Sequence, residues 1–122
     1  MTDDIHHFRN AFIAHHSMHN FSGLSALADN LIFCSTGYEP EGTLATAIEK
    51  AVEEFDPTKD ILVPVGNVAS NLLLGAAITR KSIHVQSGKD GIPVAVASFF
   101  VAVYKDTEYH VSEVTLGADD GQ

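Results

Sequence analysis

The chain contains no tryptophan, one cysteine and seven basic residues among its 122 positions. Because Cys34 is the only cysteine, no disulfide can form within the chain, which fits a reducing compartment. Sixteen acidic residues outnumber the basic ones and leave a formal net charge of -9. Nucleic-acid binding needs clustered basic side chains that contact phosphates, so this composition argues against a nucleic-acid partner. The acidic excess instead indicates a solvated surface that keeps the protein in solution.

Long apolar runs and targeting signals are lacking as well. Every apolar run ends well before the roughly 20 residues that a membrane-spanning helix requires, so we expect no membrane partner. The N-terminus carries Asp3 and Asp4 where a secretory signal would need basic residues, and we therefore predict a cytoplasmic protein. Apolar residues make up 45% of the sequence, which is typical of a folded chain. We predict a single domain over residues 1–116, followed by a flexible polar tail over 117–122.

Catalytic and cofactor motifs of high specificity are also missing. The sequence has no GxGxxG fingerprint, Walker lysine, HExxH, CxxC or G-x-S-x-G motif. Cys34 could act as a nucleophile at the end of a predicted strand, but a single cysteine there is usually a small buried hydrophobe. Glu39 and Glu41 could perform acid–base chemistry only if their surroundings separated their pKa values. No catalytic residue can be named, and the sequence favours a protein that is not an enzyme.

A strand–glycine–helix segment over residues 60–75 is the clearest feature present. The apolar run before Gly66 lacks polar alternation, which predicts a strand covered on both faces. Asn67 is a good N-cap for a mostly buried helix that ends at Arg80 and Lys81. Free N–H groups at the start of such a helix, beside the carboxyl end of a strand, are where open α/β sheets bind ligands. An ordinary strand-to-helix turn has the same pattern.

A second glycine turn follows the strand predicted over residues 31–34. If the two strands are parallel neighbours, both turns open on the same edge of the sheet. We therefore predict a site for a small anionic or nucleotide-like ligand at the carboxyl edge, formed by Ser35, Thr36, Gly37, Tyr38, Gly66 and Asn67. Turn formation and helix capping are the structural alternatives for the same residues.

The remaining periodicity predicts helices over 3–21 and 43–55 and strands over 82–87, 94–104 and 109–116. The order α-β-α-β-α-β-β-β indicates an α/β fold, with helices packed on a mixed sheet of about five strands. The strand over 94–104 is long and apolar, and its Phe99 and Phe100 place an aromatic ring on each face. One face could be covered by a partner subunit, which predicts a homo-oligomer. The alternative function is therefore a structural or protein-interaction module, for assembly or inhibition, with no small-molecule ligand.

Histidines give a third hypothesis. His15 and His19 are four residues apart on the predicted first helix, as paired metal ligands are. A third ligand could come from Cys34, His84 or His110, and the protein would then be a hydrolase that depends on a divalent metal. Histidines at the end of an amphipathic helix also serve as packing or surface residues, or as pH sensors.

Overall fold

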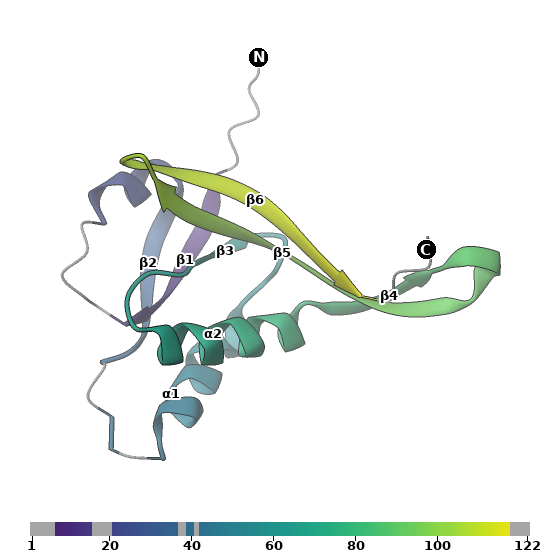
Figure 1. Cartoon of the computed structure of the whole chain (residues 1–122), viewed down its shortest axis with the longest axis horizontal. Helices are drawn as coiled ribbons and strands as arrows, with labels where there is room; N and C mark the ends of the chain where they lie inside the picture. The colour runs from purple at the N-terminus through teal and green to yellow at the C-terminus, as the bar shows by residue number, and fades with distance from the viewer. Residues whose placement is uncertain (1–6, 16–20, 37–38, 41, 118–122) are drawn as a thin grey trace.

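The computed structural model describes residues 7–15, 21–36, 39–40 and 42–117. Within these residues the chain forms a six-stranded mixed sheet with two α-helices on one face (Figure 1). This confirms the predicted fold class. No helix in the described ranges is long and apolar enough to cross a membrane. The strands are β1 (Phe8–His15), β2 (Ala28–Ser35), β3 (Asp60–Val63), β4 (Ile83–Ser87), β5 (Pro93–Lys105) and β6 (Glu108–Gly117), and the helices are α1 (Leu44–Ala51) and α2 (Val68–Lys81).

The sheet order is β2-β1-β3-β5-β4, with β6 also paired to β5. The first three strands and β5 are parallel, whereas β4 and β6 run antiparallel to β5. Since β6 pairs with β5 along residues 96–105, both β3 and β4 must lie on the other edge of β5. There β4 pairs with residues 93–97, and β3 pairs with Phe100 and Val101. The edge of β5 is thus shared by two strands, which meet near Ser98.

The first predicted helix is wrong, because residues 8–15 form the strand β1. The four-residue spacing of Phe8 and Phe12 fits a helix, but β1 lies between β2 and β3 and is covered on both faces. Phe12 packs on the helix side, and Ala11 and Ile13 pack on the other side. A strand buried on both faces shows no alternation, so its local pattern is easily taken for a buried helix.

Two apolar clusters hold the sheet. On one face Ile48 of α1 and Leu74 and Ile78 of α2 are fully buried against Phe99. On the opposite face Phe100 packs with residues of β1 and with Leu24, which lies in a short 3-10 helix over Ser22–Ala26. The prediction that Phe99 and Phe100 serve opposite faces is confirmed. Two further 3-10 turns lie at Val52–Glu54 and Lys89–Gly91.

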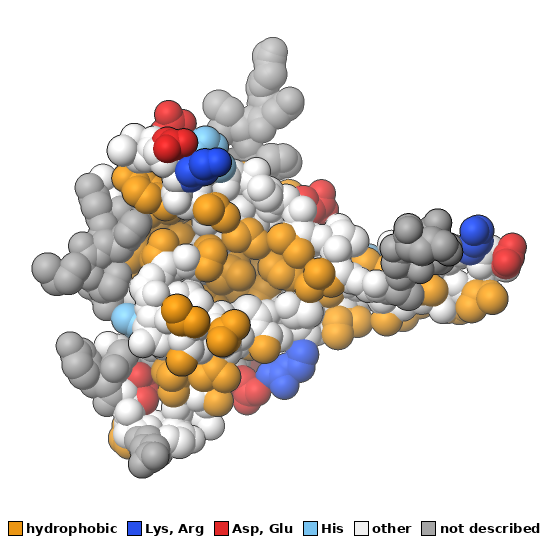
Figure 2. All heavy atoms as spheres, in the orientation of Figure 1, with side chains coloured by type: hydrophobic (Ala, Val, Ile, Leu, Met, Phe, Trp, Pro, Cys, Tyr) orange, Lys and Arg blue, Asp and Glu red, His pale blue; other side chains and the backbone are white. Residues whose placement is uncertain are grey.

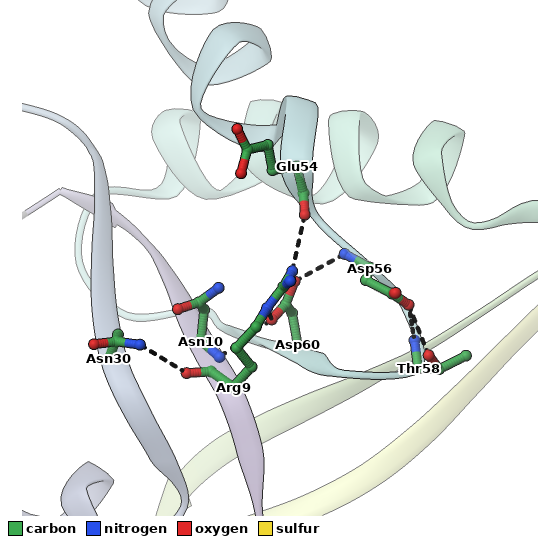
Figure 3. A network of polar contacts seen from close by, with 7 residues as sticks. All are labelled: Arg9, Asn10, Asn30, Glu54, Asp56, Thr58 and Asp60. Atoms are coloured by element: carbon green, nitrogen blue, oxygen red, sulfur yellow. Dashed lines mark hydrogen bonds and ion pairs between the residues drawn. The ribbon is translucent and has the colours of Figure 1, made fainter.

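A buried carboxylate fixes the start of β3 (Figure 3). Asp60 is fully buried and accepts hydrogen bonds from Arg9 Nε at 3.1 Å and Arg9 Nη2 at 2.7 Å. It also accepts from the backbone N–H groups of Asn10, at 3.1 Å, and Asp56, at 2.8 Å. The Asp56 carboxylate accepts from the hydroxyl and N–H of Thr58, which lowers its pKa from the ordinary value. This network joins β1, β3 and the turn over residues 56–59 that leads into β3.

The hairpin over residues 83–97, which we call the arm, extends away from the helices (Figure 1). Every residue of β4 is exposed. The tip is closed by Asp90 and Gly91, whose φ angles of 63° and 75° lie in the left-handed region. The last strand, β6, ends at Gly117. Residues 118–122 of the predicted tail lie outside the described residues.

Candidate functional site

The carboxyl ends of β1, β2 and β3 share one edge of the sheet. Ser35 of β2 is level with His15, and Val63 of β3 is level with Ile13, so β1 lies between the two predicted turns. The turns therefore open on the same edge, but their strands are not neighbours. After β1 the chain passes to the face that holds Leu24, whereas after β3 it passes through α2 on the other face. In open α/β sheets a crevice at such a divergence is the usual ligand position.

The described side chains of the first turn are already hydrogen-bonded within the chain. The buried Ser35 hydroxyl donates to Ala14 O at 3.0 Å. Thr36 donates from its N–H and its hydroxyl to Glu39 Oε2, at 2.7 and 3.2 Å. A carboxylate therefore occupies the position that an anionic ligand would take. Gly37 and Tyr38 of the predicted site lie outside the described residues.

The second turn has the geometry of a capped helix start. Gly66 has a φ of 95°, which favours glycine, and Asn67 Oδ1 accepts from Ser70 N at 3.0 Å. The Asn71 amide donates to the carbonyl oxygens of Val65 and Asn67, at 3.0 and 2.8 Å. Its Oδ1 is buried and accepts no hydrogen bond from the described residues. The N-cap assigned to Asn67 is confirmed, and this capping role already uses the side chain of the predicted ligand-binding residue.

The structure removes the geometric basis of the metal hypothesis. His15 belongs to a strand, so helical spacing does not bring it beside His19, which lies outside the described residues. Among the described residues no group of three or more histidines, cysteines or acids is arranged to hold a metal ion. Cys34 is 6% exposed, and burial raises the pKa of its thiol to about 12. That environment fits a buried hydrophobe and opposes a thiolate nucleophile.

A pocket that the sequence did not predict lies where β3 and β4 meet along β5. We call it the notch pocket; its volume is about 420 Å³, within the range of small-ligand sites. Phe8 and Phe100 form an aromatic wall, with ring centroids 5.2 Å apart. The remaining lining residues are His7, Pro57, Thr58, His84, Ser98, Phe99 and Glu113.

The polar groups of the notch pocket differ in availability. His7 contacts Ala26 O through Nδ1 at 3.3 Å and Asp29 Oδ1 through Nε2 at 2.6 Å. Both partners accept hydrogen bonds, and the hydrogen bond to Asp29 raises the pKa of His7. In the neutral tautomer that donates from His84 Nδ1 to Ser82 O, 3.4 Å away, Nε2 is an acceptor. Together with the Glu113 carboxylate, the pocket offers acceptors beside an aromatic wall.

The notch pocket draws on five separate segments of the chain, which is why sequence analysis missed it. Alternation within 82–87 did assign His84 to the face opposite Ile83 and Val85. Only the register shows that this face also carries Ser98, Phe100 and Glu113. That register depends on β3 and β4 sharing one edge of β5, and no local pattern in the sequence specifies this arrangement of strands.

Large apolar side chains are exposed on the helix side of the molecule. Figure 2 shows hydrophobic side chains gathered between α2 and the β5–β6 hairpin and along the arm. The strand residues concerned share the face of Phe99 by register. We call the helix and strand residues of this set the apolar surface: Val68, Leu72, Leu73, Ile83, Val85, Val103 and Leu116. The exposed fractions of these side chains range from 36% to 73%, far above those of the core residues.

Comparison of the chain with protein-family models, with curated proteins and with solved structures finds no match. The functional argument therefore depends on the geometry described above.

Proposed function

We propose that this protein is a non-catalytic assembly module that associates with further copies of itself through the apolar surface. The observation that carries the proposal is the exposure of Val68 and Leu72, at 73% and 69%. The two side chains are one helical turn apart, on the side of α2 that faces away from the sheet. Monomeric proteins rarely expose large contiguous apolar patches, and such patches commonly mark protein–protein interfaces.

The neighbouring groove supports a second copy as the partner. Between α1 and α2 lies a cavity of about 220 Å³, lined in part by Ala45, Leu73 and Ala76. An ion pair between Arg80 and Glu49, 2.5 Å long, borders it. The projecting pair Val68 and Leu72 beside an apolar groove is the combination that lets two like helices pack ridge into groove. Interfaces with such a core and a charged rim are typical of stable association.

Leu72→Glu should weaken this association by at least about tenfold, because it buries an unpaired carboxylate in the interface. Sedimentation velocity from about 1 to 100 µM protein measures the change, a range that resolves dissociation constants in the micromolar range. Leu72→Met is the matched control, since it retains apolar character at the same position, and it should assemble like the parent chain. An unchanged sedimentation profile for Leu72→Glu would rule out the apolar surface as the interface.

A second candidate function is binding of a small ligand in the notch pocket. The specific observation is the pairing of two acceptors, Glu113 and His84 Nε2, with the aromatic wall of Phe8 and Phe100. These groups fit an organic amine with an apolar body, because the ammonium can pair with the carboxylate and the body can stack on the rings. The anionic or nucleotide-like ligand at the carboxyl edge stays a prediction, and it would have to displace Glu39 from Thr36.

Phenethylamine is a suitable probe for the notch pocket. At millimolar concentration it should raise the melting temperature of the parent protein by a few degrees, as preferential binding to the folded state requires. Glu113→Gln should abolish the shift, because it removes the counter-charge and leaves the aromatic wall intact. Glu108→Gln, on the same strand but outside the notch pocket, is the control and should keep it. Equal shifts in both variants would disprove binding in this pocket.

A further inference from the structure

The free edge of β4 carries an inference that goes beyond the proposed function and does not use α2. Among the described residues β4 pairs with β5 alone, so its other edge has no strand beside it. Its five residues are all exposed, and Ile83 and Val85 are 53% and 68% exposed. Natural proteins normally protect such an edge with charge, proline or a covering element. The strand Ile-His-Val-Gln-Ser contains neither proline nor a formally charged residue.

The ladder shows which main-chain groups point outward. In an antiparallel pair, residues alternate between bonded pairs and pairs that direct their N–H and C=O groups away from each other. Gly88 N donates to Ile92 O at 2.7 Å, and Ser98 N donates to Ser82 O at 3.4 Å, so even-numbered residues form the bonded pairs with β5. The outward N–H and C=O groups of β4 are therefore those of Ile83, Val85 and Ser87.

We infer that β4 pairs antiparallel with β4 of a second copy of this chain, around a two-fold axis at Val85. This arrangement sets Val85 opposite its own equivalent and Ile83 opposite Ser87, so all three outward residues of each strand are used. About six main-chain hydrogen bonds would form, two for each bonded pair. The result is a continuous sheet through both arms, closed by symmetry.

Two features favour a second copy over a foreign strand. An antiparallel pair of identical strands is self-complementary, and β4 brings no charge that would repel its equivalent in a chain of net charge -9. The arm extends away from the helices, which leaves room for a second body (Figure 1).

The arm also lacks the burial that would hold it alone. Beyond residue 96 towards the tip, β6 no longer pairs with β5, and the arm is a two-stranded hairpin. Isolated hairpins of two strands are marginally stable in water. A partner strand on the free edge would convert the two arms into a four-stranded sheet, with the exposed Ile83 and Val85 of both copies on one face.

Val85→Pro tests the inference, because the Val85 N–H points away from β5 and its loss leaves the hairpin ladder intact. Sedimentation velocity of the full chain should show a dimer for the parent protein. For Val85→Pro the dissociation constant should rise at least about 100-fold, since proline removes central donors and obstructs the approaching strand. Val85→Thr is the matched control and should remain dimeric. Circular dichroism of each variant checks that the fold is retained.

A cysteine variant gives a direct readout of the register. Val85→Cys should form a disulfide-linked dimer under mild oxidation, because this pairing sets residue 85 opposite its own equivalent. His84→Cys should not, because residue 84 lies opposite residue 86 of the second copy and not opposite its own equivalent. If Leu72→Glu disrupts the dimer and Val85→Pro leaves it intact, the β4 pairing is overturned and the proposed function is supported. Disruption by Val85→Pro alone would support the pairing and contradict the role of α2. A parent protein that stays monomeric at 100 µM would overturn both.

Discussion

Replacing Asp60 with alanine is expected to destabilise the fold by several kcal/mol, because a hydrogen bond to a charged group typically contributes about 1.5–3 kcal/mol and four such bonds are lost. The side chain is fully buried and accepts four hydrogen bonds, two of them from Arg9. Alanine would leave the N–H groups of Asn10 and Asp56 without an acceptor, and unsatisfied buried donors are costly. Because small domains have total stabilities of roughly 5–15 kcal/mol, the variant should be close to unfolding at room temperature.

Urea unfolding followed by circular dichroism measures the change in the free energy of unfolding. Glu49→Gln is the matched control, since it also removes one carboxylate from an ion pair with arginine. That pair is exposed, with side-chain exposures of 64% for Arg80 and 55% for Glu49, and we expect a loss below about 1 kcal/mol. Similar losses for the two variants would show that the Asp60 network does not determine the stability of the sheet.

The role of Asp60 also shows where sequence analysis reached its limit. In the sequence it marks only the polar boundary of an apolar run. Its partner Arg9 is 51 positions away, and the two meet because β1 and β3 are adjacent and parallel. The strand and helix that follow Asp60 were predictable, since Gly66 and Asn67 supply local turn and capping signals. Contacts that depend on strand order have no such local signal.

Residues 8–15 illustrate the same limit for secondary structure. The apolar spacing that predicted a helix is real, but β1 occupies the middle of the parallel strands and buries both of its faces. A strand with one face exposed to solvent would have shown alternating apolar and polar residues, and sequence analysis would have identified it as a strand. The two strands that precede the glycine turns end at the same edge of the sheet, but the condition that they be neighbours was wrong, because β1 lies between them. The notch pocket and the free edge of β4 both follow from the sharing of one edge of β5, which only the complete topology reveals.

Cys34 gives the second large expected effect, in the rate at which a thiol reagent labels the folded protein. Burial raises the pKa of the thiol from 9.0 to about 12, and only the thiolate reacts. At pH 8 the thiolate fraction of the folded protein should therefore be about 1,000-fold below that of the unfolded chain, since each pKa unit is a factor of ten. Labelling with Ellman's reagent, with and without 8 M urea, measures the ratio. The urea serves only to unfold the chain, so that the thiol of the reference sample is fully exposed to solvent.

The pH dependence of labelling distinguishes a raised pKa from simple inaccessibility. In urea the rate should level off above about pH 9, the ordinary value of the thiol, whereas in the folded protein it should keep rising towards pH 12. The same shift makes the folded state bind the thiol proton more tightly, so the free energy of unfolding should fall as pH rises from 9 to 12. Ser112→Cys in a Cys34→Ala background is the exposed control and should react as fast as the unfolded chain. Rapid labelling of Cys34 in the folded protein would restore the nucleophile hypothesis, because a reactive thiol beside Ser35 at the carboxyl edge would then be available for chemistry.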